Sequence, residues 1–170
     1  LDNFFDFTND LISFYKFDCR CCGNIKLKRI ISLGFQPLAN NLINNKKNKF
    51  DTYPLELNYC EDCRNVQLSV SVLNKKMFKK YFYLSSASKE LINHFRDAAL
   101  KYKKELSLNL NSKILDVGSN DGIGLKPFYD AGYKNLVGIE PASNVAKIAN
   151  KKGIKTINKF LNYTSIRKIK

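Results

Sequence analysis

The segment Lys113-Ile114-Leu115-Asp116-Val117-Gly118-Ser119-Asn120-Asp121-Gly122 decides the fold class of this 170-residue chain. Residues 113–117 form an apolar run that opens into a glycine-containing turn, and a second apolar run at 136–139 ends at Glu140. In open α/β sheets, such a turn lets backbone N–H groups approach a ligand closely. An acid at the tip of the next strand accepts hydrogen bonds from ribose hydroxyls. The segment therefore predicts an adenosine-binding α/β domain.

The residues around this turn predict alternating strands and helices. A helix is expected from near Leu125 to Gly132, with Pro127 in its first turn. A second helix is expected after Ser143 as N-cap and before Gly153. A buried strand is expected at residues 113–117, a second strand is expected at 136–139, and a third is expected to start at 155–157. The order strand-helix-strand-helix-strand predicts a parallel sheet.

The glycine spacing and the charge of the turn distinguish between two ligand classes. Dinucleotide folds use Gly-x-Gly-x-x-Gly, whereas the glycines here fall at 118, 122 and 124. Asp116 ends the first strand, and its negative charge repels a pyrophosphate but suits a cation. S-adenosylmethionine carries a sulfonium and an amino group and has no phosphate, so the turn favours it over NAD. An ordinary strand-turn-helix without a ligand remains the alternative.

The cysteines form two Cys-x-x-Cys pairs, Cys19/Cys22 and Cys60/Cys63, with 37 residues between them. Four thiolates in two such pairs suit a closed tetrahedral zinc site with a structural role. Cys21 is left over, because the spacing favours Cys22 as the ligand. Gly23 follows the first pair, where a positive φ is expected.

Disulfides or unconnected core cysteines are the alternatives to zinc. Asp2, Asp6 and Asp10 interrupt the apolar residues at the N-terminus, which therefore does not resemble a signal peptide. We expect a cytoplasmic protein, in which disulfides are rare. The single histidine, His94, falls in an expected helix and is interpreted as a surface or pocket residue and not as a metal ligand.

Runs of β character at residues 26–33, 55–59 and 66–72 surround the second cysteine pair and predict a small ribbon that depends on its metal. The predicted fold class is an α+β zinc-binding module followed by an incomplete α/β Rossmann-like core. The expected domains are an N-terminal extension (1–17), a zinc-binding domain (18–80), a linker with the first helix of the core (81–110) and a partial S-adenosylmethionine-binding domain (111–170).

The linker region, residues 81–88, contains two tyrosines and three serines before an expected helix. That helix begins near Ser88 and has one apolar face, formed by Leu91, Phe95, Ala98, Tyr102 and Leu106. A serine cluster at this place either caps the helix or lines a cleft between domains, and the sequence favours neither interpretation.

Together these features resemble a family, the S-adenosylmethionine-dependent C-methyltransferases that act on nucleotide-linked deoxysugars. Members of that family have an N-terminal zinc-binding domain, a class I methyltransferase core and a C-terminal domain. The resemblance runs from Asp18 to Phe160. The matching segments, in order, are Cys19-Arg20-Cys21-Cys22-Gly23, Leu33-Gly34-Phe35-Gln36-Pro37-Leu38-Ala39-Asn40, Tyr53-Pro54-Leu55, Tyr59-Cys60-Glu61-Asp62-Cys63, Val66-Gln67-Leu68, Tyr83-Leu84-Ser85-Ser86-Ala87-Ser88, Leu115-Asp116-Val117-Gly118-Ser119-Asn120-Asp121-Gly122 and Gly138-Ile139-Glu140-Pro141.

The resemblance implies a role for each matched position. It places S-adenosylmethionine against Asp116, Gly118, Asn120 and Gly122, with Glu140 on the ribose. It brings Tyr83 and Ser86 near the cofactor or the sugar. It assigns Cys19, Cys22, Cys60 and Cys63 to a structural zinc ion. In the family, a base removes a proton beside a keto group of the sugar, and the resulting carbanion or enolate attacks the methyl group.

Only three strands of the core are visible, whereas a doubly wound sheet has roughly five or six. We therefore expect this chain to be a fragment, a truncated product or one part of a split enzyme that a second chain completes. The family's acceptor-side catalytic groups lie further along its chain, so no catalytic residue is assigned and the chain alone is expected to be inactive. A non-catalytic interaction module is a further alternative.

The formal net charge of +14, from 29 Lys+Arg against 15 Asp+Glu, makes a nucleic-acid-binding zinc ribbon the alternative function. The basic residues are not gathered on one helix face or arm, however, and a basic cleft would also attract the pyrophosphate of a nucleotide-sugar. The sequence therefore disfavours nucleic acid. It contains no apolar stretch of about 18 residues, so no membrane span is expected. The phenylalanine-rich residues 1–17 are either an amphipathic element or a partner contact.

Overall fold

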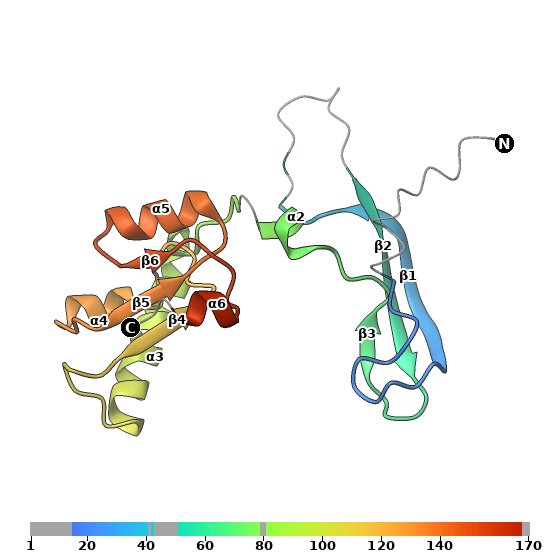
Figure 1. Ribbon diagram of the computed structural model, residues 1–170, viewed down its shortest axis with the longest axis horizontal. Helices are drawn as coiled ribbons and strands as arrows, with labels where there is room; N and C mark the ends of the chain where they lie inside the picture. The colour runs from blue at the N-terminus through green and yellow to red at the C-terminus, as the bar shows by residue number, and fades with distance from the viewer. Residues whose placement is uncertain (1–14, 41, 43–50, 79–80, 168–170) are drawn as a thin grey trace. The chain divides into compact units, whose positions relative to one another are not determined.

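The computed structural model describes residues 15–40, 42, 51–78 and 81–167. The chain divides into two compact units, Leu1–Met77 and Phe78–Lys170 (Figure 1). Most of the phenylalanine-rich N-terminal segment lies outside the described residues. The Asn/Lys-rich run at 44–49 lies outside them as well.

Unit 1 contains an antiparallel sheet in the order β1-β2-β3, with β1 at Leu27–Pro37, β2 at Thr52–Cys60 and β3 at Val66–Leu68. A short helix, α2 (Asn74–Phe78), follows. β1 is longer than the sequence predicts, because its pairing with β2 continues past Gly34 to Pro37. β3 is shorter than the predicted run at 66–72. It pairs only with residues 57–59 of β2, and beyond it Val70 forms an isolated bridge with Tyr15.

Unit 2 begins with a 3-10 turn, η1 (Ser85–Ala87), and the long helix α3 (Lys89–Glu105). The helix α3 begins near Ser88, as predicted; Ser88 is its N-cap, and its Oγ accepts a hydrogen bond from the backbone N–H of Leu91 over 3.2 Å. One of the three linker serines is therefore a helix cap.

The second sheet is parallel, as predicted, in the order β4-β5-β6. Its strands are β4 (Ile114–Val117), β5 (Leu136–Ile139) and β6 (Thr156–Ile157). The helices between and after them are α4 (Lys126–Asp130), α5 (Ser143–Lys151) and α6 (Tyr163–Ile166). The prediction that Ser143 caps α5 was wrong: the N-cap is Ala142, and Ser143 is the first helical residue.

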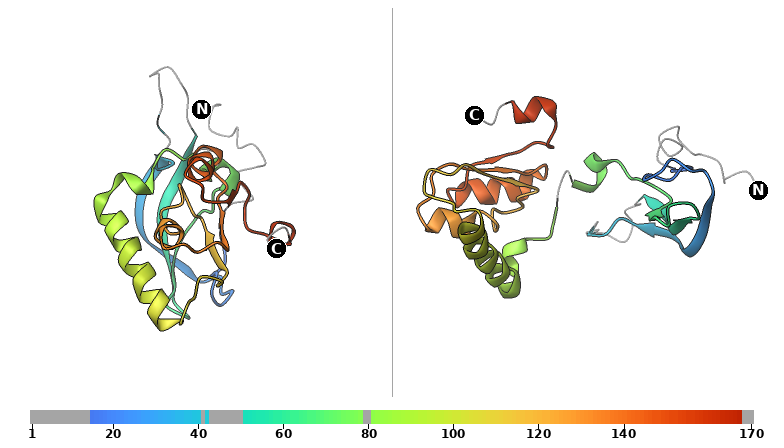
Figure 2. Two further views of the ribbon diagram at one scale, coloured as in Figure 1. Left: turned by 90° about the vertical axis from the view of Figure 1, so that its left-hand side faces the viewer. Right: turned by 90° about the horizontal axis from the view of Figure 1, so that it is seen from below.

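The core of unit 2 lies between one face of the sheet and the helices α3 and α4 (Figure 2). Its buried residues include Leu136 from the sheet, Ala99 from α3 and Phe128 from α4. Strand residues alternate between the two faces of a sheet. The prediction that residues 113–117 are fully buried was therefore wrong, since Leu115 and Val117 point to the other face and are 41% and 53% exposed.

Candidate functional site

The first site is the four-cysteine cluster of unit 1. Cys19 and Cys22 lie in the turn before β1, which closes at Gly23 with a φ of 76°. Cys60 ends β2, and Cys63 lies in the turn that follows. The register that pairs Leu27 with Cys60 brings the two turns together.

The four sulfur atoms all lie within 4.8 Å of one another. The Sγ–Sγ distances are 3.5 Å for Cys19–Cys63 and 3.6 Å for Cys22–Cys60. Tetrahedral coordination with zinc–sulfur bonds of about 2.3 Å requires sulfur–sulfur separations of about 3.8 Å. The cluster therefore fits a zinc ion with four thiolate ligands.

Groups around the cluster support this assignment. Backbone hydrogen bonds, chiefly from Cys22, lower the pKa of the Cys19 thiol to about 6. The side-chain amide of Asn65 also donates to Cys19 Sγ over 3.7 Å. All five cysteines are free thiols, and Cys21 is exposed and lies outside the cluster. Zinc binds cysteine as the thiolate, and four cysteine ligands leave no coordination position open for chemistry.

The second site is the turn between β4 and α4. Gly118 has a φ of 77°, and its N–H donates to the carbonyl oxygen of Ile139 over 2.8 Å. This bond ties the turn to the end of the neighbouring strand. A Cβ atom on Gly118 would meet nothing within 4 Å, so the space beside this residue is open. The turn can therefore be approached closely by a ligand.

Two carboxylates flank the turn at the ends of adjacent strands. Burial, together with the charge of Glu140, raises the pKa of Asp116. A Cβ atom on Gly124 would lie 2.7 Å from Asp116 Oδ2, so the position of this carboxylate depends on a glycine that follows Gly118 by six residues. Gly124 was not among the predicted site residues. The mutual repulsion of the two acids favours a cation beside them.

Glu140 is buried, and each of its oxygens accepts a backbone hydrogen bond. The N–H of Asn120 donates to Oε2 over 2.9 Å, and the N–H of Ala142 donates to Oε1 over 2.8 Å. The carboxylate therefore connects the turn to the start of α5.

The linker segment lies against the same turn. The backbone N–H of Ser85 donates to Oδ1 of Asn120 over 3.1 Å, and Nδ2 of Asn120 donates to the carbonyl oxygen of Tyr83 over 3.2 Å. Asn120 adopts a φ of 48°, which asparagine tolerates better than most residues. The structure thus brings Tyr83 and Ser86 to the glycine turn from a segment 35 residues earlier in the chain.

Asp121 is a site residue to which the sequence assigned no role. Its side chain is fully buried, and its Oδ2 accepts hydrogen bonds from the hydroxyl of Ser86 and from Nζ of Lys152, the latter over 2.7 Å. Its Oδ1 has no hydrogen-bond partner. Nothing in the spacing of the motif signals the pairing with Lys152, which lies 31 residues away.

The predicted site residues therefore form two groups. Cys19, Cys22, Cys60 and Cys63 meet in unit 1. Tyr83, Ser86, Asp116, Gly118, Asn120, Gly122 and Glu140 belong to unit 2, around the carboxyl ends of β4 and β5. His94 is exposed on α3 and packs edge-on against Phe95.

Known proteins are similar to this chain in parts of both units. Residues 19–78 match the family model of a methyltransferase-associated zinc binding domain. Over 142 residues, the chain is 30% identical to the C-methyltransferase NovU of Streptomyces niveus. The chain is therefore similar to a C-methyltransferase over most of its own length. The similarity covers 82% of this chain and 34% of the relative, so the chain spans about a third of that methyltransferase's length.

The similarity extends well beyond the zinc domain, because 142 aligned residues exceed the 60 residues at 19–78. It therefore includes a large part of unit 2. In the part of the chain that the structure describes, no helix combines the length and the apolar character needed to cross a membrane.

Proposed function

We propose that this chain is the zinc-binding and cofactor-binding part of an S-adenosylmethionine-dependent C-methyltransferase. In this proposal, unit 2 is the first half of a Rossmann-like class I methyltransferase core. The observation that carries the proposal is the pair of carboxylates, Asp116 and Glu140, on either side of a turn that is open beside Gly118. Such a pair favours the sulfonium and ammonium groups of S-adenosylmethionine and disfavours the pyrophosphate of a dinucleotide.

The residues of the turn suit this cofactor. Asp116, Gly118, Asn120 and Gly122 would hold S-adenosylmethionine, and Glu140 would accept hydrogen bonds from the ribose. Both oxygens of Glu140 already accept one backbone hydrogen bond, and each retains a second lone pair for a hydroxyl. Tyr83 is half-exposed beside the turn, where its ring would border the cofactor or the acceptor.

We propose a nucleotide-linked keto-deoxysugar as the acceptor. A keto group acidifies the adjacent C–H bond, so a base can remove that proton and leave an enolate whose carbon takes the methyl group. S-adenosylmethionine supplies the methyl group when it is bound. The net charge of +14 would attract the pyrophosphate of such a substrate. The base remains unassigned, and it is expected outside the residues described above.

We further propose that additional strands pair with the outer edge of β4, supplied by a later segment of a longer protein or by a second chain. No described strand occupies this edge. The uncovered apolar side chains of Leu115 and Val117 point to the face that helices of such a completing segment would cover.

The first test is calorimetric titration of S-adenosylmethionine into the zinc-loaded chain, with zinc per chain measured on the same sample. We expect one zinc and saturable binding that NAD does not displace. One zinc without any binding would contradict the proposed cofactor site in this chain.

The acceptor is tested by a methyl-transfer assay with a nucleotide-linked keto-deoxysugar. We expect no turnover by this chain alone, and turnover once a chain that supplies the missing strands is co-expressed. Turnover by this chain alone would contradict the proposed division of the catalytic groups.

The alternative of a nucleic-acid-binding zinc ribbon is not favoured by the comparisons, which point to methyltransferases. Filter binding to DNA at several salt concentrations separates the two functions. If lysines and arginines bind the phosphates of DNA, the affinity should fall steeply as the salt concentration rises. The methyltransferase proposal instead predicts weak binding to DNA at every salt concentration.

A further inference from the structure

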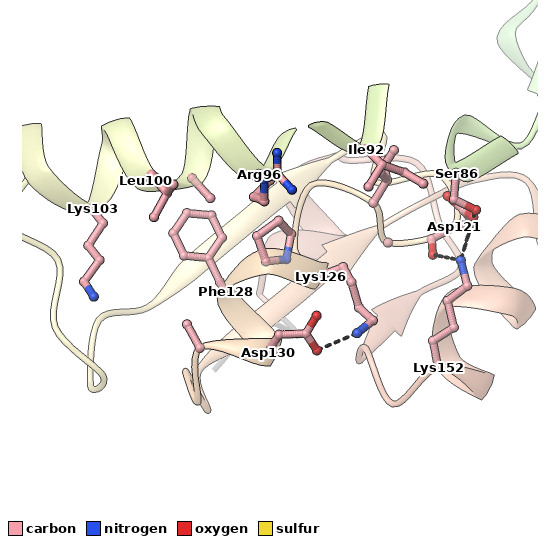
Figure 3. Close-up of a pocket in the computed structure, with 15 residues that line it drawn as sticks. Ser86, Ile92, Arg96, Leu100, Lys103, Asp121, Lys126, Phe128, Asp130 and Lys152 are labelled. Carbon is pink, nitrogen blue, oxygen red and sulfur yellow. Dashed lines mark hydrogen bonds and ion pairs between the residues drawn. The ribbon is translucent and has the colours of Figure 1, made fainter. Parts of the chain in front are cut away.

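A groove of about 720 Å³ lies along α3 and α4 in unit 2 (Figure 3). Its walls are largely apolar, with Ile92 and Leu100 from α3 facing Phe128 from α4. Leu100 is 63% exposed although it is a large aliphatic residue. Pockets of about 300–1,000 Å³ with mainly apolar walls are typical of small-molecule sites. The groove therefore has the size and lining of a ligand site.

Cations dominate the charged groups of the groove. Arg96 and Lys103 come from α3, and Lys126 from α4. The two acids that line the groove, Asp121 and Asp130, are engaged in ion pairs with Lys152 and Lys126. Among the described residues, the ion pair of Arg96 is an exposed contact between its Nε and Oδ1 of Asp97 at 3.5 Å, and Lys103 has no ion pair. Two cations of α3 are thus left to interact with an anionic ligand.

The groove differs from the proposed cofactor site. Asp116, Gly118 and Glu140 do not line it, and only Ser86 and Gly122 border both. The two sites also prefer opposite charges. The acids beside Gly118 suit a cationic cofactor, whereas Arg96 and Lys103 suit an anion. One ligand would not serve both sites equally well.

We propose that this groove is a second ligand site of unit 2, and that it binds a small organic anion with an apolar or aromatic body. The apolar body lies between Leu100 and Phe128, and the anionic group pairs with Arg96 or Lys103, which lie on either side of Leu100 along α3. Burial of apolar area supplies the main attraction, and the two cations select the anionic form.

The proposal is tested with 4-phenylbutyrate as the anionic probe and 4-phenylbutanamide as its uncharged match. Each is titrated into the isotope-labelled, zinc-loaded chain and followed by the amide signals of unit 2. We expect saturable shifts confined to α3, α4 and the turn at 121–123. The anion is expected to bind about threefold to tenfold more tightly than the amide, because charge-assisted hydrogen bonds are stronger than neutral ones.

Two variants separate the contribution of the cations from that of the apolar walls. Arg96→Gln combined with Lys103→Gln should remove the preference for the anion, and Leu100→Asp should weaken both probes. Lys101→Gln is the matched control, because Lys101 lies on the same helix and does not line the groove. The amide spectrum without probe shows whether each variant is folded. Equal affinity of the wild-type chain for both probes, or shifts spread over other surfaces, would overturn the proposal.

Discussion

The backbone N–H of Asn120 donates a hydrogen bond to Oε2 of Glu140 over 2.9 Å, and so joins the turn after β4 to the tip of β5. The other oxygen of Glu140 accepts from the N–H of Ala142. The acid that the sequence assigned to the ribose therefore also holds the backbone of the binding turn in place. Loss of its charge should disturb structure and binding together.

We expect Glu140→Gln to lower both the stability of unit 2 and its affinity for S-adenosylmethionine. An amide replaces one acceptor oxygen by an NH₂ group, so one of the two buried backbone N–H groups loses its partner, at a cost of about 1–3 kcal/mol. Calorimetric titration should show at least about a tenfold weaker affinity, since 1.4 kcal/mol corresponds to one order of magnitude. Glu105→Gln is the control, because Glu105 is exposed and lies 3.9 Å from Lys101. Unchanged affinity in Glu140→Gln would contradict the ribose assignment.

Asp116→Asn should stabilise the chain at neutral pH while weakening binding of the cofactor. Burial and the charge of Glu140 raise the pKa of Asp116 from its usual 3.8. The folded state thus binds this proton more tightly than the unfolded chain does, so ionised Asp116 lowers the free energy of unfolding above its folded pKa. That penalty disappears as the pH falls below the pKa of the unfolded chain.

Thermal unfolding as a function of pH checks this prediction. The midpoint of Asp116→Asn should exceed that of the wild type at pH 7 by about 4–8 °C for each kcal/mol removed, the range for a unit of the size of Phe78–Lys170. The difference should shrink toward pH 4. A difference that grows with acidity would show that the carboxylate is stabilised in the folded state and not penalised.

Cys63→Ser should abolish stoichiometric zinc binding, because a serine hydroxyl is a poor replacement for a thiolate. We expect the β signal of unit 1 to decrease with the metal, since the metal provides much of the folding free energy of a small zinc domain. Metal analysis and circular dichroism of the purified variant measure both effects. Cys21→Ser should retain one zinc per chain, because Cys21 is exposed and outside the cluster. The reverse outcome would place Cys21 among the ligands.

Replacing Asn120 by alanine should lower the stability of unit 2 more than replacing it by glycine. Both changes remove its side-chain hydrogen bonds to Ser85 and Tyr83. Only alanine also strains the backbone, which has a φ of 48° here, and this strain costs about 1–2 kcal/mol. Hydrogen exchange at the Ser85 amide should be faster in both variants, and the melting temperature should fall further for Asn120→Ala. Equal melting temperatures would contradict the contribution of the backbone conformation.

Local features of this chain could be predicted from its sequence. The strand at 136–139, the start of α3 near Ser88 and the positive φ at Gly23 all depend on residues that are neighbours in the chain. The spacing of the cysteines likewise selected Cys22, which the structure places in the cluster. The parallel sheet followed from the order of its elements.

Features that depend on distant residues could not be predicted. The exposure of Leu115 and Val117 arises from which face of the sheet the helices cover, whereas their apolar character alone indicates burial. The pairing of Asp121 with Lys152 and the approach of Gly124 to Asp116 depend on how α4 and α5 pack. The N-cap of α5 was predicted one residue too late, at Ser143. The N-cap is Ala142, whose backbone N–H donates to Oε1 of Glu140, and the sequence pattern does not show this contact.

The four-cysteine cluster joins the start of β1 to the end of β2, because Leu27, the first residue of β1, pairs with Cys60, which belongs to the cluster. The metal thus closes the hairpin of β1 and β2 at the end opposite to the connecting segment 38–51. The pairing of Leu27 with Cys60, next to the metal site, does not depend on that connection, although the register shifts further along, between Arg29 and Ile31 and between Ser32 and Phe35. The length and composition of segment 38–51 can therefore vary among related proteins. If this segment were cleaved, a bound ion would still hold the two strands together.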